Sequence, residues 1–191
     1  PYYGKTEQAE GLWVRAEARD GTTRFYQGAT AYVIWRDQRV TLAIKFVLPT
    51  DDRVGILSCL LERLIGLNYR IKTLFLDRGF DSVPVMRFLT QHTRLRAVIA
   101  CTIRGKTGGT RALCHGRGSY YTRHTFNSPE HGAFTADVAV CKVFTTARRT
   151  GRNPRRAHWM IFILIRCAFS PQRVCQAYRR RFGIESNYRC A

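Results

Sequence analysis

The stretch that decides the fold is residues 71–80, IKTLFLDRGF, in which an apolar run ends at Asp77 and a polar turn follows. Before it, residues 51–67 carry apolar side chains at helical spacing behind an aspartate cap. Before that helix, residues 40–48 have the pattern of a strand. A strand, a helix and a second strand of these lengths predict a right-handed crossover within one sheet. The sequence therefore predicts an α/β fold.

Two strands are predicted upstream of this unit, at residues 22–35 and 40–48, joined by the polar turn 36–39. Residues 1–21 are polar and are predicted to be irregular. Apolar residues alternate along the second strand, at Val40, Leu42, Ile44, Phe46 and Leu48. We expect the face that carries them to be buried more heavily than the opposite face.

Downstream of Asp77 the pattern continues and then changes. Ser82 precedes a helix predicted to end near His92, and residues 95–103 predict another strand. A region rich in Gly, Arg and Thr follows, and Ser170-Pro171 opens a last predicted helix. The predicted organisation is a first core segment, a β-rich insertion and a final helix that completes the core, at residues 1–103, 104–168 and 169–191.

The charge of the chain indicates its partner. The 191 residues include 32 Lys and Arg but only 13 Asp and Glu, which gives a formal net charge of +19. The 45% hydrophobic content is normal for a folded chain, which argues against a disordered basic tail. No apolar run approaches the ~20 residues that span a bilayer, and no secretory signal pattern is present. We expect a soluble protein that binds a polyanion and not a membrane.

The seven cysteines are an odd number and include no C-x-x-C pair. A disulfide framework is therefore disfavoured, and a reducing cytoplasm is the simpler expectation. Cys101, Cys114, His115 and Cys141 fall in one region, but their spacing matches no zinc signature. We interpret them as core or strand residues.

A basic loop, ARRTGRNPRRA, occupies residues 147–157. We predict that it binds DNA phosphates and adds affinity and salt dependence rather than sequence specificity; the alternative is a solvated loop. Its arginines are Arg148, Arg149, Arg152, Arg155 and Arg156. Trp159 beside it either stacks on an unpaired base or belongs to the core.

Two acids stand out in so basic a chain. Asp77 lies where a strand ends, and carboxyl ends of strands are where sites form in α/β sheets; the alternative is a cap for the next helix. Glu185 follows Tyr178 and Arg181 at helical spacing, so the three share one face; the alternative is an ordinary Arg–Glu salt bridge. Together the two carboxylates are of the type that holds a pair of divalent cations for phosphodiester chemistry.

The segment LFLDRGF at 74–80, and the order Tyr178, Arg181, Glu185, resemble the DDE transposases of bacterial and archaeal insertion sequences. The opening PYYGK and the strand RFYQGATAYVIW at 24–35 are also similar to that family, so the resemblance covers nearly the whole chain. It implies an RNase H-like mixed sheet flanked by helices, with the β-rich insertion placed before the last helix.

The resemblance also implies roles for single residues. Asp77 and Glu185 would be catalytic and would bind two Mg²⁺ or Mn²⁺ ions. Tyr178 and Arg181 would support them by contacting the DNA backbone, and Arg179 and Arg180 would face DNA from the same helix. The first catalytic aspartate has no match here, so we expect it upstream of Pro1 on the first core strand. On that expectation the 191-residue chain alone is inactive and poorly stable.

The predicted function is that of a DNA transposase enzyme, which cleaves double-stranded DNA at element ends and transfers the strand to target DNA. The resemblance implies a homodimer in a synaptic complex and a cytoplasmic, nucleoid-associated location. Two alternatives stay open, a non-catalytic DNA-binding remnant of a transposase and another RNase H-like nuclease. A ribosomal or RNA-binding protein fits the charge but predicts neither acid in its setting.

Overall fold

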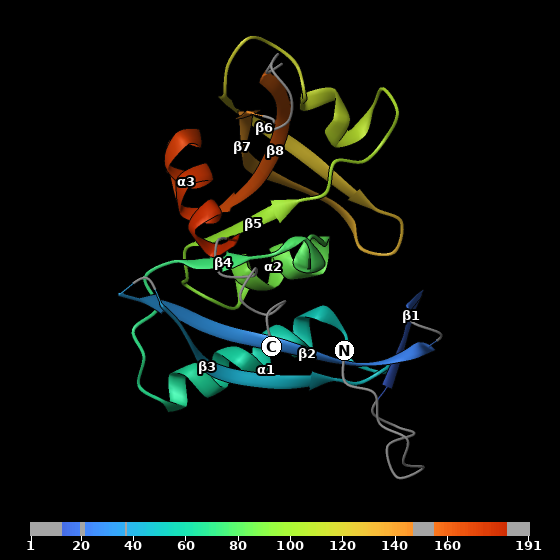
Figure 1. Ribbon diagram of the computed structural model, residues 1–191, viewed down its shortest axis with the longest axis vertical. Helices are drawn as coiled ribbons and strands as arrows, with labels where there is room; N and C mark the ends of the chain where they lie inside the picture. Colours follow the sequence, from blue (N-terminus) through green and yellow to red (C-terminus); the bar gives the residue numbers. More distant parts are fainter. Residues whose placement is uncertain (1–12, 20–21, 37, 147–154, 183–191) are drawn as a thin grey trace. The chain divides into compact units, whose positions relative to one another are not determined.

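The computed structural model describes residues 13–19, 22–36, 38–146 and 155–182 (Figure 1). The chain divides into two compact units, residues 1–70 and 71–191. Each unit has a sheet of its own. No helix among the described residues is long and apolar enough to cross a membrane.

The first unit contains an antiparallel sheet in the order β1-β2-β3, with β1 at Trp13–Arg19, β2 at Thr22–Trp35 and β3 at Gln38–Val47. The predicted hairpin is confirmed. The prediction that residues 1–21 are irregular is wrong for β1, which pairs with the first residues of β2. The sequence of β1, WVRAEAR, contains three charged residues and so does not have the composition of a typical strand. Its backbone hydrogen bonds with β2 nevertheless stabilise it as an edge strand.

Helix α1, Arg53–Gly66, begins at Asp52, whose side chain accepts a 2.6 Å hydrogen bond from the amide of Gly55. The helix packs on β3 and covers one face of the sheet (Figure 1). Its buried side chains are Ile56, Leu57, Leu60, Leu61 and Leu64. This spacing of three and four residues is the apolar stripe that the sequence predicted.

Strand β3 turns toward α1 the face opposite to the predicted one. Ala43 and Val47 are buried, whereas Ile44 is 50% exposed and Phe46 64% exposed. The expectation that the Val40–Phe46 face is buried more heavily is therefore wrong. Ala31 pairs with Ala43 and Tyr32 with Thr41, which leaves Leu42 as an extra residue in a bulge. The alternation in sequence does not follow one face across this bulge.

A partly buried ion pair joins β3 to the residues just before α1. The ammonium of Lys45 lies 2.6 Å from Oδ2 of Asp51, and the amide of Leu48 donates to the same oxygen at 2.8 Å. The hydrogen bond from Leu48, and then that from Lys45, hold the pKa of Asp51 below its ordinary value. The ionised carboxylate therefore stabilises the folded unit.

The Asp51→Asn variant should be less stable than the wild type only at pH values at which the wild-type carboxylate is ionised. Because the folded pKa lies below the unfolded value of ~3.9, the stabilisation is present above that pH and is lost as the pH falls through the folded pKa. Urea unfolding should show a lower free energy for the variant near neutral pH and no difference in strong acid. The matched control is Glu62→Gln, which removes an exposed acid. A difference in unfolding free energy between Asp51→Asn and the wild type that stays the same at every pH would contradict the argument.

The second unit contains a five-stranded mixed sheet in the order β4-β5-β8-β7-β6. Only β4 and β5 are parallel, and the other pairs are antiparallel. The strands are β4 Leu74–Leu76, β5 Ala97–Cys101, β6 Tyr120–Ser128, β7 Gly132–Thr146 and β8 Arg155–Ile165. A mixed sheet flanked by helices confirms the α/β class.

The predicted crossover is found in a different place. Strand β3 pairs with β2 and β4 pairs with β5, so in the described part of the chain β3 and β4 belong to different sheets. The prediction that they share one sheet is wrong, because each finds its partner nearer in sequence. The strand–helix–strand unit is instead β4, α2 (Val83–Gln91) and β5, whose strands are parallel.

Helix α3, Pro171–Phe182, covers one face of the sheet (Figure 1). Under it lies a buried cluster built from alternate residues of three strands: Val98, Ala100, Ala139, Cys141, Val143, Phe162 and Leu164. The intervening residues of these strands, such as Ile99, Val138 and Ile163, are also buried. Their side of the sheet is the one on which α2 packs, so the sheet is covered on both faces.

Candidate functional site

The carboxyl ends of β4 and β5 lie side by side because these two strands are parallel neighbours. Asp77 follows the last residue of β4, and Thr102 follows the last residue of β5. The Asp77 side chain is exposed to solvent. The structure thus places one predicted site residue at the sheet edge where α/β folds bind ligands.

Asp77 also has a local structural role. Its Oδ1 accepts a 3.0 Å hydrogen bond from the amide of Gly79 and so begins the short 3₁₀ helix η2, Arg78–Phe80. A Cβ at Gly79 would lie 3.0 Å from this oxygen, so the glycine allows the close approach. Ser82 stands at the start of α2, but its side chain makes no capping bond there. The capping alternative for Asp77 therefore describes a real contact, and its catalytic role stays a prediction.

Asp81 is a second acid at this edge, and sequence reasoning missed it. It is 5% exposed, its Oδ2 accepts a 2.8 Å hydrogen bond from the amide of Thr102, and Arg104 Nη2 lies 3.6 Å from the same oxygen. This hydrogen bond joins the turn after β4 to the end of β5. The available signal was the repeated acid in DRGFD, in a chain with only 13 acids.

The loop after β5 is held by one buried hydroxyl. Oγ1 of Thr110 donates to the carbonyl of Thr102 and accepts from the amide of Arg104, both at 2.8 Å. Gly105 has φ +92°, and a Cβ there would lie 2.3 Å from the carbonyl oxygen of Gly108. These contacts hold the Arg104 backbone beside Asp81, while the Arg104 side chain stays largely exposed.

The Asp81→Ala variant should destabilise the second unit by about 1–3 kcal/mol, because it leaves the partly buried amide of Thr102 without its acceptor. Asp81→Asn should cost less, since the amide oxygen of Asn can still accept that bond. Urea unfolding followed by circular dichroism measures both. Asp137→Ala, which removes an exposed acid, is the control, and equal midpoints for Asp81→Ala and this control would contradict the role of Asp81.

The structure describes α3 as far as Phe182 and so places only some of the site residues predicted on this helix. Tyr178 is 2% exposed, and its ring meets that of Phe162 edge-on with centroids 4.9 Å apart. Arg179 and Arg180 are exposed on α3. Arg181 belongs to α3, but its side chain lies outside the described residues, as does Glu185. The structure therefore brings Tyr178 into the core, and a phosphate contact by this residue stays a prediction.

The basic loop falls mostly outside the described part of the chain. Arg148, Arg149 and Arg152 are not described, whereas Arg155 and Arg156 begin β8 and pair with Thr146 and Thr145. Trp159 is half-buried on β8, and the ammonium of Lys142 lies 5.2 Å from the centre of its ring. Both interpretations of Trp159, core residue and stacking platform, stay open.

No group of three or more His, Cys, Asp and Glu that could hold a metal gathers among the described residues. Glu185 is not one of them, so the predicted ligand set is not tested. Cys101 and Cys141 are buried in β5 and β7, which confirms their interpretation as core residues.

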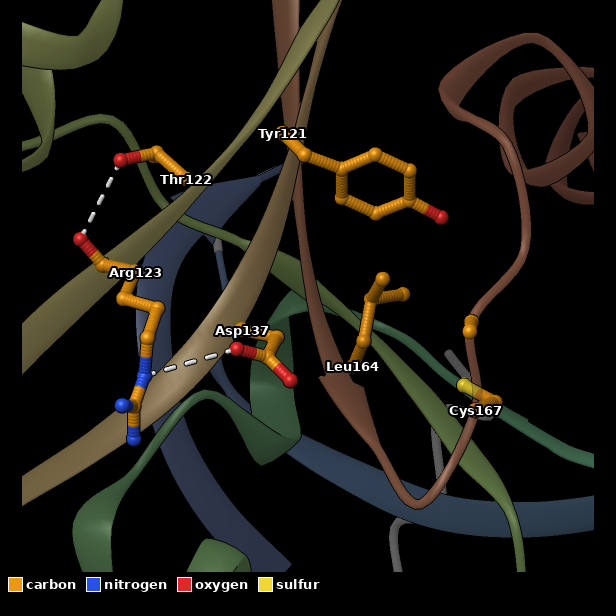
Figure 2. Close-up of a pocket in the computed structure, with 7 residues that line it drawn as sticks. Tyr121, Thr122, Arg123, Asp137, Leu164 and Cys167 are labelled. Atoms are coloured by element: carbon orange, nitrogen blue, oxygen red, sulfur yellow. Dashed lines mark hydrogen bonds and ion pairs between the residues drawn. The ribbon is translucent and has the colours of Figure 1, made fainter.

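An open hollow of about 360 Å³ lies between β6, β7 and the end of β8 (Figure 2). Its lining is Tyr121, Thr122, Arg123, Asp137, Leu164, Cys167 and Ala168. Arg123 Nε lies 3.6 Å from Asp137 Oδ1, and both side chains are mostly exposed. None of the predicted site residues lines this hollow.

Comparison with known proteins adds no assignment: no protein-family model, no curated protein and no solved structure matches the chain. Function is therefore argued from the residues. Those at the β4–β5 edge are Asp77, Arg78, Asp81 and Arg104, two acids with two exposed arginines. Such an edge combines a group that can bind a hard cation with groups that can bind phosphate.

Proposed function

We propose that the chain is the catalytic part of a DDE-type DNA transposase with an RNase H-like fold. The observation that carries the proposal is the exposed Asp77 carboxylate at the end of β4, beside a parallel strand. A carboxylate in this position can bind a hard divalent cation while the sheet holds it in place. The resemblance of 74–80 and of the Tyr178–Glu185 segment to that family supplies the reaction class.

In the proposed reaction a water cleaves DNA, and the freed 3′-hydroxyl then attacks target DNA. Asp77 and Glu185 would hold Mg²⁺ or Mn²⁺; Asp77 fits as an exposed oxygen donor. The bound ions supply activation of the attacking oxygen and stabilisation of the leaving one. Asp77 would hold a cation at a fixed place relative to the sheet, and the hydrogen bond that its Oδ1 accepts from the amide of Gly79 orients the carboxylate.

The surface charge supports DNA as the substrate. Arg78 and Arg104 are exposed at the β4–β5 edge, and Arg179 and Arg180 are exposed on α3. Arginine binds phosphate oxygens through paired donors, so these side chains suit a DNA backbone. With a net charge of +19 the protein attracts DNA over long range at low salt. The synaptic dimer and the nucleoid location belong to the same proposal.

The edge of β4 supports the position proposed for the first aspartate. Among the described residues β4 pairs with β5 along one edge and with no strand along the other. Three apolar residues with an open edge are a weak strand, and a further strand pairing there would complete it. We propose that the first catalytic aspartate lies on such a strand.

Binding to duplex DNA tests the electrostatic part of the proposal. Fluorescence anisotropy should give a dissociation constant that rises steeply with salt, with a slope of about 0.9 per phosphate neutralised on logarithmic axes. The Arg179→Gln/Arg180→Gln variant should weaken binding and reduce the slope by about 1–2. Arg94→Gln/Arg96→Gln removes the same charge ahead of β5 and is the matched control. Equal losses in both double variants would mean that only net charge, and not α3, contributes.

A non-catalytic DNA-binding protein is the second candidate, and the cap formed by Asp77 favours it. A carboxylate that begins η2 has a structural reason to be present without any metal. Such a protein would show the same salt-dependent binding but no cleavage with Mg²⁺ or Mn²⁺ in its full-length form. Binding and cleavage measured on the same preparation therefore separate the two candidates.

A further inference from the structure

A basic loop, RGKTGGTR at residues 104–111, follows β5. Arg104, Lys106 and Arg111 are exposed on it, and the loop contains no acid. Among the described residues, Asp81 pairs with Arg104, and no acid forms an ion pair with Lys106 or Arg111. The 104–111 loop therefore presents positive charge that the described part of the protein does not neutralise.

The 104–111 loop begins at the edge of the sheet that holds Asp77. Strands β4 and β5 are parallel neighbours, and β5 contacts η2, the turn that Asp77 begins. Asp81 joins this turn to the end of β5, because its carboxylate accepts a hydrogen bond from the amide of Thr102 and lies beside Arg104. A ligand that contacted Asp77 at this edge would therefore have the basic loop next to it.

The loop is held in one shape by its own contacts. The amide of Arg111 donates to the carbonyl of Arg104 at 3.0 Å, and the Nε of the same residue donates to the carbonyl of Gly105 at 3.2 Å. The buried hydroxyl of Thr110 closes the loop from inside through its two 2.8 Å hydrogen bonds. The left-handed φ of +92° at Gly105 lets the chain turn back so closely that a side chain there would meet the Gly108 carbonyl. A site whose groups are already in place loses little entropy when it binds a ligand.

Three exposed amides add directed donors to the charge of the loop. The amides of Lys106, Thr107 and Gly108 donate no hydrogen bond to any residue that the structure describes. The hydrogen bonds that hold Arg111 do not use its two Nη groups. Backbone amides beside basic side chains suit the oxygens of a phosphate group, which accept several hydrogen bonds at once.

We propose that the 104–111 loop is a phosphate-binding site whose ligand is the backbone of a DNA strand that passes the carboxyl ends of β4 and β5. The proposal rests on the function proposed above, because it takes DNA as the substrate, and it adds the site that positions the strand. Lys106 and Arg111 supply the charge, and the amides supply the directed donors. Because contacts to phosphate carry no sequence information, the loop sets the place of the strand relative to Asp77 and not the sequence that is bound.

The test measures the binding of a short DNA duplex by the full chain at several salt concentrations. The Lys106→Gln/Arg111→Gln variant should weaken binding roughly tenfold and reduce the salt slope by about 1–2. Thr110→Val removes the hydroxyl that closes the loop but no charge, so it should weaken binding and leave the slope unchanged. In the wild type, the amide NMR signals of Lys106, Thr107 and Gly108 should shift when the duplex is added.

The matched control is Arg94→Gln/Arg96→Gln, which removes the same exposed charge ahead of β5, at the opposite end of that strand, and should weaken binding less. If the wild type binds the duplex, but the loop variant loses no more affinity than this control and the loop amides do not shift, the phosphate site is overturned while the proposed function stands. Absence of binding by the wild type would overturn the proposed function and the phosphate site together. Equal shifts of the loop amides with inorganic phosphate, at the same phosphate concentration, would overturn the assignment of the site to DNA.

Discussion

On the proposed function, the Asp77→Asn variant is expected to lower metal-dependent DNA cleavage at least ~10³-fold in a protein that carries this chain together with the proposed first aspartate, because a ligand worth several kcal/mol of charge stabilisation would be lost. The substitution keeps an oxygen that can accept the hydrogen bond from Gly79, so η2 and the stability of the unit should be preserved. Cleavage is measured on DNA that carries the ends of the element, with Mg²⁺ and with Mn²⁺. Unchanged urea unfolding alongside lost cleavage would assign Asp77 to catalysis rather than to capping.

Glu130→Gln provides the matched control for this prediction. Glu130 lies between β6 and β7, is 86% exposed and changes charge by the same amount. Its variant should cleave like the wild type, and Glu185→Gln should fail like Asp77→Asn. Wild-type cleavage by Asp77→Asn would leave the carboxylate only its capping role, whereas absence of cleavage by the wild type itself would favour the DNA-binding candidate.

The Tyr178→Ala variant is expected to lose about 3–5 kcal/mol of unfolding free energy, because it removes a ring that is 2% exposed and opens a cavity beside Phe162. Tyr178→Phe keeps the ring and should preserve most of the stability. Urea unfolding measures both. If the hydroxyl also contacts a phosphate, as the resemblance implies, Tyr178→Phe should weaken DNA binding while leaving unfolding nearly unchanged.

Phe144→Ala serves as the control for the loss of a ring. Phe144 is on β7 and is 56% exposed, so its removal should cost little. A Tyr178→Ala midpoint no lower than that of Phe144→Ala would show that the core under α3 tolerates the cavity. That outcome would contradict the packing argument for Tyr178.

The local elements of the fold could be predicted from the sequence. The hairpin of β2 and β3 and the starts of α1 and α3 depend on turn residues, caps and periodicity within a few positions. Sheet partners could not be predicted in the same way. Ala97 pairs with Ile165, a partner 68 positions away, and no periodicity within either strand carries that information. The predicted crossover was wrong for this reason, since it assigned β3 and β4 to one sheet from their order alone.

In the candidate site, too, local features could be predicted from the sequence, whereas contacts between separate elements could not. The apolar run before Asp77 places this residue at a strand end, and the structure has it there. Helical spacing groups Tyr178 with Arg181 on one face, but it does not say whether that face meets solvent or the sheet, and the structure buries Tyr178. The hydrogen bond between Asp81 and Thr102, and that between Cys141 and Pro171, arise only when separate elements pack together.

The extra residue Leu42 has a consequence for how the β2–β3 hairpin can change in length. Ile44 and Phe46 lie on the far side from α1, and the register on either side of Leu42 differs by one position. Deleting this one residue would restore an unbroken ladder and keep every cross-strand pair, because the Ala31–Ala43 and Tyr32–Thr41 pairs would become consecutive. A one-residue deletion in the regular part of a strand would instead move its side chains to the opposite face. The hairpin can therefore lose a residue at Leu42 without exchanging its two faces.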